Sequence, residues 1–477
     1  MPLRPGRARP AHLRRREADP RAEGHRAQPA AVAADSSELP VLGSLLAMRA
    51  RPLEFIRERA SVQGDVASFR LGRRPCFLVT SDEGIRTILH EAHASLPKNP
   101  HYTDTMSAVL GDGLITSDGE LHRRQRRLVQ PAFQGQHMDG FSRRIARLAA
   151  DLADSWASNA ESGEPVDACA AMNELTLAIV LQVLFGEDHP ANATSAMLEA
   201  FGELNRQLNE DIFAIAKLPR WVPTPRNDRF RRALRRLDDA VLTLIARRRR
   251  TPAAGDDVIS LLIAARDDET GESMTDRLLR DEILTMMAAG HETSADGLVW
   301  TLSLLAHEPA VAARVREEVR AGLRGGLPDR DAVARLPYTR MVIEETLRLY
   351  PPAYMFDRVA RADVEVAGIP IPAGATVYLS PYVTHRKPEY WDSPDAVDPE
   401  RFTRARAADR PRFAYFPFGA GPRQCIGGGF AMLEMHIVVA TILQRWRLDP
   451  VSREMPAPRP HITLRPPDRV LLRVRPA

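Results

Sequence analysis

The sequence predicts a mainly α fold with a small strand-rich lobe, organised as one large domain. Apolar residues recur with helical spacing over long segments in the middle of the chain. Short runs of β-branched and aromatic residues, separated by Gly and Pro, lie towards its two ends. The hydrophobic content of 44% is enough for a sizeable core.

Each expected element follows from one of these two patterns. The helical pattern covers residues 141–156, 175–185, 229–250 and 275–307. The strand pattern predicts one hairpin over 66–71 and 75–80, another over 364–377, and further strands at 462–465 and 470–473.

Composition restricts location and partners. Residues 1–38 are rich in Arg, Ala and Pro and are predicted to be disordered, which leaves 39–477 as the folded domain. The longest apolar run, 175–185, is shorter than the roughly 20 residues that cross a bilayer, so no transmembrane anchor is expected. The net charge is only +4, and the excess of Arg over Lys indicates coding bias rather than nucleic-acid binding. The three cysteines form no disulfide framework, which favours a cytoplasmic protein.

Cys425 is the first candidate for chemistry. It lies in a glycine-rich turn, Phe418 to Gly427, that leads into a predicted helix. Backbone N–H groups and the positive end of a helix would stabilise a thiolate there. Gly421 and Gly427 would let the backbone approach a flat macrocycle. The turn therefore indicates a metal-bound thiolate, and a haem held through sulfur is suited to oxygen activation.

This turn resembles the haem-binding signature of the cytochrome P450 monooxygenases, Phe-x-x-Gly-x-Arg-x-Cys-x-Gly. The five fixed positions are matched by Phe418, Gly421, Arg423, Cys425 and Gly427. The resemblance implies the cytochrome P450 fold and haem b with Cys425 as the axial ligand of the iron, as in soluble bacterial members of the family.

A second motif is assigned to structure. Glu345 and Arg348 lie three residues apart and share a face of a predicted helix, where they can pair. They resemble the Glu-x-x-Arg motif of the family, and Arg401, in Pro-Glu-Arg-Phe, resembles the arginine that completes its ion network.

The third motif, Ala289 to Ser294, lies inside the predicted helix 275–307. Gly290 and a threonine bonded to a backbone carbonyl can together open a groove in a helix. The segment resembles the Ala-Gly-x-(Asp/Glu)-Thr motif of the family. By that likeness Thr293 would hold the hydrogen bonds at bound dioxygen, and Glu292 would relay protons from solvent.

Other site residues follow from the resemblance. His122 and Arg126, which share a helix face, would bind the haem propionates together with Arg358 and Arg423. The neighbouring basic residues are expected to form a solvated face that could steer an acidic electron-transfer partner; these are Arg123, Arg124 and Arg127. The predicted substrate pocket is apolar, and its proposed lining is Val109, Ile115, Phe213, Met287, Ala289, Met355 and Phe356.

The resemblance implies a monooxygenase that inserts one oxygen atom from O2 into a lipophilic small molecule of terpenoid, fatty acyl or polyketide type. Electrons would come from a separate ferredoxin or flavodoxin with an NAD(P)H-dependent reductase, and the enzyme is expected to be a monomer. Two alternatives stay open: a peroxygenase or an isomerase or dehydratase on the same fold, and a non-catalytic haem-thiolate ligand-binding protein. The presence of both Glu292 and Thr293 favours the monooxygenase.

Overall fold

A 32-residue helix, α12 (Asp276–His307), runs through the centre of the molecule. The computed structural model describes residues 41–186, 191–212, 218–250 and 257–477. The helix begins where the Thr275 hydroxyl accepts a hydrogen bond from the N–H of Leu278 at 3.2 Å. Asp276 in its first turn and His307 in its last complement the helix dipole.

The helices packed directly on α12 include α8 (Ala168–Phe185), α10 (Pro225–Arg250), α15 (Pro337–Leu349) and α18 (Gly428–Arg445). The other helical segments are α1 (Leu45–Ala50), α2 (Pro52–Gln63), α3 (Asp82–Arg86), η1 (Thr87–Glu91), α4 (Pro100–Leu110), α5 (Gly119–Val129), η2 (Gln130–Phe133), α6 (His137–Ser155), α7 (Ala157–Ser162), α9 (Ala191–Ile212), α11 (Val258–Ala264), α13 (Pro309–Leu323), α14 (Arg330–Ala334), α16 (Pro381–Thr384), η3 (Pro399–Phe402), α17 (Arg404–Ala407), η4 (Arg412–Ala414) and η5 (Gly421–Arg423).

The strands form four small sheets. The largest has the order β1-β2-β7-β4, in which β2 and β7 are parallel and the other pairs are antiparallel. A second has the order β3-β11-β8, and two hairpins pair β5 with β6 and β9 with β10. The bounds are β1 (Val66–Leu71), β2 (Arg74–Val79), β3 (Val166–Asp167), β4 (Phe356–Val359), β5 (Val364–Val366), β6 (Ile369–Ile371), β7 (Thr376–Leu379), β8 (Trp446–Pro450), β9 (Arg459–Pro460), β10 (Leu464–Arg465) and β11 (Leu471–Pro476).

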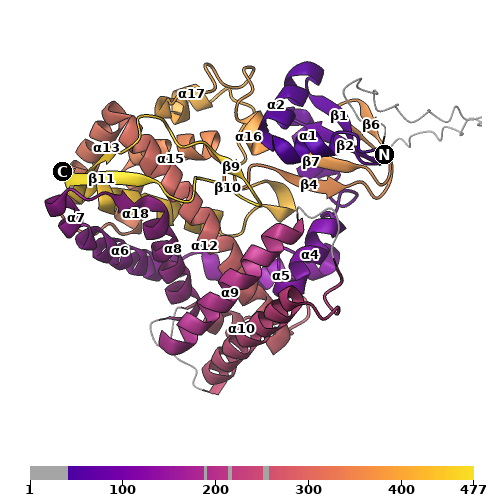
Figure 1. Cartoon of the computed structure of the whole chain (residues 1–477), viewed down its shortest axis with the longest axis horizontal. Helices are drawn as coiled ribbons and strands as arrows, with labels where there is room; N and C mark the ends of the chain where they lie inside the picture. The colour runs from indigo at the N-terminus through magenta and orange to yellow at the C-terminus, as the bar shows by residue number, and fades with distance from the viewer. Residues whose placement is uncertain (1–40, 187–190, 213–217, 251–256) are drawn as a thin grey trace, which may run out of the picture.

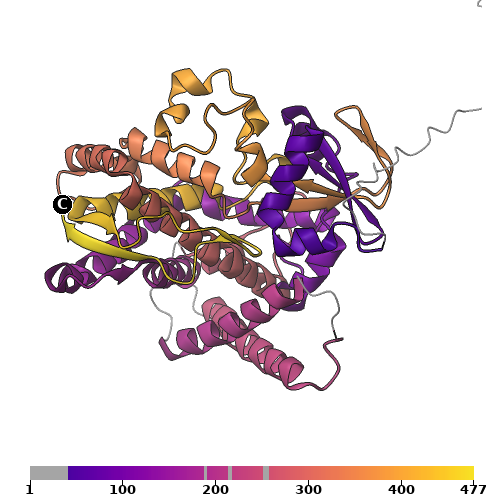
Figure 2. The same ribbon diagram turned by 45° about the horizontal axis from the view of Figure 1, so that its top comes forward.

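The two larger sheets lie on opposite sides of the helical body. The four-stranded sheet, with α1 and α2, occupies one side, and β11, near the C-terminus, lies with α7 at the other (Figure 1). The long helices α9 and α10 lie side by side in both views, at the edge of the molecule away from α13 and α17 (Figure 2).

The predicted fold class, mainly α with small sheets, is confirmed. One strand was misplaced: the hairpin predicted over 364–377 ends at Ile371, and β7 instead pairs in parallel with β2. This pairing is between strands far apart in the sequence, so local pattern does not indicate it. The predicted disordered segment, 1–38, lies outside the described residues.

Helix α8 starts seven residues before the predicted segment 175–185 because Asp167 caps it, accepting a hydrogen bond from the N–H of Cys169 at 3.1 Å. At 18 residues it is long and apolar enough to cross a membrane by length and composition, and no other helix in the described part of the chain is. However, 61% of this segment is buried, and α8 packs along α12. The apolar surface of α8 therefore packs in the protein core.

Candidate active site

Cys425 lies in the turn that leads into α18, where the sequence predicted it. Its N–H donates to the Phe418 carbonyl at 2.9 Å, and the N–H groups of Gly427 and Gly428 hydrogen-bond to its sulfur. Burial raises the pKa of the Cys425 thiol, while these two N–H groups and the charge of Arg126 oppose the rise. A metal ion at this sulfur would form a thiolate that the peptide dipoles already stabilise. Phe418 is partly buried and packs against the main core.

Of the three glycines in the turn, Gly421 and Gly427 have different surroundings. Gly421 has φ of +70°, and a Cβ there would collide with the carbonyl of Leu89 in η1. The structure therefore shows a close approach of Gly421 to another part of the backbone, and its approach to a macrocycle stays a prediction. Gly427 has ordinary backbone angles, and no described residue lies within 4 Å of the position a Cβ would take.

Two of the predicted propionate ligands come from α5. His122 is buried, with 6% of its surface exposed. Arg126 lies one turn later, and its Nη1 donates to the carbonyl of Gln424 at 2.7 Å, directly beside Cys425. Helix α5 thereby fixes both side chains relative to the cysteine turn.

The other two predicted propionate ligands come from β4 and from the cysteine turn. Arg358 donates to its neighbouring carbonyl, that of Asp357, at 2.7 Å. Arg423 pairs with Asp118 and donates to the carbonyls of His93 and Leu96 at 3.1 and 3.2 Å. Arg423 is thus held by an ion pair within the protein. Arg358 donates to a backbone carbonyl and lies over the Phe356 ring at 5.4 Å, and neither contact brings a full negative charge.

Lys98 completes this cluster and was missed from the sequence. Its Nζ donates to the carbonyls of Leu114 and Ser117 at 2.7 and 2.9 Å. Burial, followed by the charge of Arg358, lowers the pKa of Lys98 to about 7. Burial with Lys98 and Arg423 lowers the pKa of His122 to about 4, and burial with Arg423 lowers that of Arg358 to about 10.

The same two causes lower all three pKa values: each group is removed from water, and each lies close to other cations. Such a cluster has too few anions, and it fits a ligand that brings two carboxylates, as haem does with its propionates. The sequence offered one indirect signal for Lys98, because a lysine is unusual in this chain: only three of its 66 basic residues are lysines.

The centre of α12, residues 289–294, differs from the prediction in one respect. The Thr293 hydroxyl donates to the carbonyl of Ala289 at 2.6 Å, as expected for a threonine in a helix. The helix is nevertheless unbroken from Asp276 to His307. A Cβ at Gly290 would lie 3.2 Å from Val180 of α8, so this glycine permits close helix packing rather than a groove. Ala289 is exposed although α12 is central, which indicates an accessible space beside it.

Glu292 is held in an ion pair with Arg465, and 14% of its side chain is exposed. Arg465 of β10 donates to its Oε1 through Nε at 2.7 Å and also through Nη2. The Thr463 hydroxyl donates to the same oxygen at 2.8 Å, and Asn205 of α9 donates to Oε2 at 2.9 Å. Burial alone would raise the pKa of Glu292, but Arg465 and these hydrogen bonds outweigh it and lower the pKa. The carboxylate therefore joins α12 to two distant segments, α9 and residues 463–465, neither of which the sequence connected to it.

The proposed pocket residues divide into two groups. Val109 and Met287 are 1% and 0% exposed and pack in the main core, so they do not line an accessible space. The others remain at least partly accessible: Ile115, Ala289, Met355 and Phe356. Phe213 lies outside the described residues.

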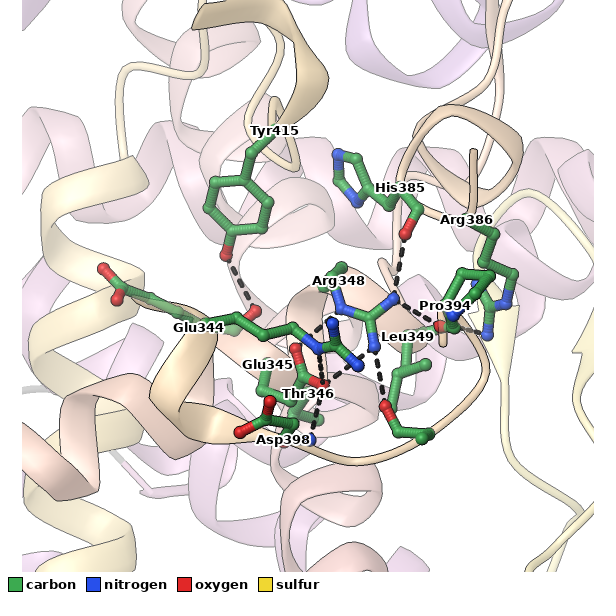
Figure 3. Close-up of polar contacts among 12 residues, drawn as sticks. Glu344, Glu345, Thr346, Arg348, Leu349, His385, Arg386, Pro394, Asp398 and Tyr415 are labelled. Atoms are coloured by element: carbon green, nitrogen blue, oxygen red, sulfur yellow. Dashed lines mark hydrogen bonds and ion pairs between the residues drawn. The ribbon is translucent and has the colours of Figure 1, made fainter. Parts of the chain in front are cut away.

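Glu345 and Arg348 form a buried ion pair (Figure 3). Arg401 extends this pair into a buried network. Arg348 donates to Glu345 through Nε at 2.6 Å and Nη2 at 2.8 Å. Arg401 Nε lies 3.4 Å from Glu345 Oε1, and the N–H of Asp398 donates to the same oxygen at 2.8 Å. No member is more than 4% exposed at its side chain, which suits a structural role.

The predicted basic face is largely neutralised. Each of its arginines has an acidic partner; the pairs are Arg123 with Glu120, Arg124 with Glu272, and Arg127 with Asp267 and Glu269. The predicted solvated face therefore carries less net positive charge than its arginines alone suggest, because Glu120 of α5 and three acids distant in sequence pair with them.

Comparisons with known proteins agree with this site. The cytochrome P450 family model matches residues 35–474. The chain is 36% identical to cyclooctatin synthase of Streptomyces melanosporofaciens, covering 89% of this chain and 92% of that one. It is 34% identical to cyclooctat-9-en-7-ol 5-monooxygenase of the same organism, covering 87% and 88% of the two chains.

Two further comparisons extend the likeness. Pentalenene oxygenase of Streptomyces avermitilis is 34% identical, covering 86% of this chain and 90% of that one. The crystal structure of the haem domain of cytochrome P450DA superposes with a TM-score of 0.83 and 25% identity, covering 92% of this chain and 96% of that one. The chain therefore belongs to the cytochrome P450 family, binds haem b through a cysteine thiolate and is a monooxygenase.

Proposed function

We propose that this monooxygenase hydroxylates an apolar terpenoid, rather than a fatty acyl or polyketide substrate, at an unactivated carbon. The observation that carries the proposal is the likeness, over most of the chain, to enzymes named for pentalenene and cyclooctat-9-en-7-ol. The accessible residues of the predicted pocket are apolar, which suits a hydrocarbon skeleton.

The test is a binding and product screen of the purified holoprotein. Terpene hydrocarbons and alcohols are compared with fatty acids and macrolactones of similar size, using the substrate-induced shift of the Soret band and mass spectrometry of products. A terpenoid that shifts the band and gains one oxygen atom is the expected result. Turnover of fatty acids alone would contradict the proposal.

The proposed cofactor roles follow from the positions of the side chains. Cys425 would hold the haem iron through its thiolate, and Lys98, His122, Arg126 and Arg358 would bind the propionates, with Arg423 bracing the turn through Asp118. Bound haem supplies the oxygen-activating chemistry, which thiolate ligation favours. The chain itself orients the cofactor, limits water and delivers protons.

Lys98→Met is expected to weaken haem retention. Hydrogen bonds to charged groups contribute about 1.5–3 kcal/mol, so haem should leave between about 10-fold and 100-fold faster. The measurement is the rate of haem transfer to excess apomyoglobin. Lys387→Met is the matched control, because Lys387 pairs with Asp65 outside this cluster and should leave the rate unchanged. Equal rates in both variants would remove Lys98 from the site.

We propose that Thr293 and Glu292 deliver protons to the oxygen chemistry. Thr293→Ala should still bind substrate but should release hydrogen peroxide in place of product, because it lacks the hydroxyl that holds the proton network. The measurement is the ratio of product to NAD(P)H consumed. Thr293→Ser keeps a hydroxyl and should retain most of this coupling, and unchanged coupling in the alanine variant would refute the role.

We propose that the electrons come from a ferredoxin or flavodoxin with its NAD(P)H-dependent reductase. The enzyme is proposed to be a monomer in the cytoplasm. Because three of the four arginines of α5 are paired with acids, docking there should depend only weakly on ionic strength. Stopped-flow reduction at increasing salt measures this directly, and a steep fall in rate would show that another, unpaired basic surface receives the partner.

A further inference from the structure

Asp296 is a second carboxyl on α12, one turn after Glu292 and on the same helix face. It is 6% exposed, and its Oδ2 has no hydrogen-bond partner among the described residues. Buried polar atoms are ordinarily paired, so an unpaired carboxyl oxygen beside a proton-relay candidate calls for a functional reason.

Thr463 connects the two carboxyls. Its hydroxyl donates to Glu292 Oε1 at 2.8 Å and also interacts with the side chain of Asp296. A hydroxyl can donate one hydrogen bond while accepting another, so it can stand between a protonated acid and a carboxylate. The turn between β9 and β10 therefore places a hydroxyl through which a proton can pass from one of these acids to the other.

The charges around Asp296 favour its neutral form. Burial, followed by the charge of Glu292, raises the pKa of Asp296 to about 8, and Thr463 and Arg465 only partly oppose this. From α8, Cys169 also faces it, but burial raises the pKa of that thiol to about 12, so Cys169 carries no charge. The environments thus push the pKa values of Glu292 and Asp296 apart, as in acid–base pairs of other enzymes.

We propose that Asp296 stores the proton that Glu292 lacks and passes it on through the Thr463 hydroxyl. The O–H bond of Asp296 breaks as the Thr463 oxygen takes its proton, and the proton originally on Thr463 forms the O–H bond of Glu292. One proton moves, and no electron is exchanged. Arg465 acts on both carboxyls, so it stabilises the negative charge before and after the transfer.

This inference rests on the proposed relay role of Glu292, but its first test does not require turnover. Infrared spectra of the holoprotein are recorded in the region of the protonated carboxyl stretch. The wild type minus Asp296→Asn difference should contain one such band at pH 7 that disappears on titration above pH 8. Absence of the band, or its disappearance below pH 6, would overturn the proposal.

Two variants test the coupling in the same spectra. Glu292→Gln removes a nearby negative charge and should lower the midpoint of the Asp296 band by about one pH unit. Thr463→Val should shift the band frequency, because it removes the hydroxyl. Glu434→Gln is the matched control: Glu434 is another buried acid, with a pKa that burial raises to about 8, but it contacts Ser294. Its loss should leave the Asp296 band in place.

The second test is a double-mutant cycle on peroxide release. Asp296→Asn should raise the fraction of reductant released as peroxide, and it should have no further effect once Glu292 is Gln, because it acts through that residue. Independent effects that add would overturn the relay while leaving the monooxygenase assignment intact. The infrared test is independent of this cycle, because it requires no turnover and would give the same result in an inactive enzyme.

Discussion

Arg348→Ala is expected to yield little or no folded holoprotein. The guanidinium donates two hydrogen bonds to Glu345 and reaches the carbonyls of His385 and Pro394 at 2.9 and 2.6 Å (Figure 3). It also donates to the Ala396 carbonyl at 3.0 Å. Its removal strands a carboxylate that is fully buried and frees three carbonyls in the segment that follows α16. Breaking a buried pair costs about 3–5 kcal/mol. The total stability of a protein is about 5–15 kcal/mol, so this loss is large.

The same helix offers a matched control for this variant. Arg340 and Glu344 also form an ion pair on α15, at 3.0 Å, but the Arg340 side chain is 64% exposed. Arg340→Ala should therefore change the free energy of unfolding by about 0.5 kcal/mol or less. Soluble yield, haem content and urea unfolding measure both variants. Similar values for the two would mean that the buried network does not stabilise the fold.

Cys425→Ala is expected to abolish monooxygenase activity. Without its sulfur the chain has no thiolate at the start of α18, and the Soret band of the reduced carbon monoxide complex should lose the far-red position that thiolate ligation gives. The N–H groups of Gly427 and Gly428 would then point to a methyl group instead of a charge. The measurement is the carbon monoxide difference spectrum together with product formation.

The other two cysteines provide the controls. Cys76 is fully buried in the sheet region, and the Cys169 thiol donates to the Pro467 carbonyl at 3.2 Å. Cys76→Ala and Cys169→Ala should keep the red-shifted band, with at most a loss of stability of about 1–3 kcal/mol. A red-shifted band that survives Cys425→Ala but not one of these variants would reassign the ligand.

The sequence by itself determined the features that depend on neighbours along the chain. The helical period of 275–307 and the alternation of 66–71 reproduce α12 and β1, because the side-chain pattern of an element reflects its own backbone geometry. The cysteine turn and the pair of Glu345 with Arg348 are equally local, and they lie where they were expected. Together with the family resemblance, they were enough to predict the chemistry.

Only the tertiary structure decided which distant charges meet. The sequence predicted that Glu292 relays protons, but it did not indicate that Arg465 pairs with this carboxylate or that Asn205 donates a hydrogen bond to it. Lys98 joins the propionate cluster although nothing beside it in the sequence suggests a ligand. The pKa of a side chain depends on its burial and on the charges around it in space. Burial and the surrounding charges are set only when β10, α9 and α12 pack together. The sequence therefore identified the acidic and basic residues, and the fold determined which of them carry protons.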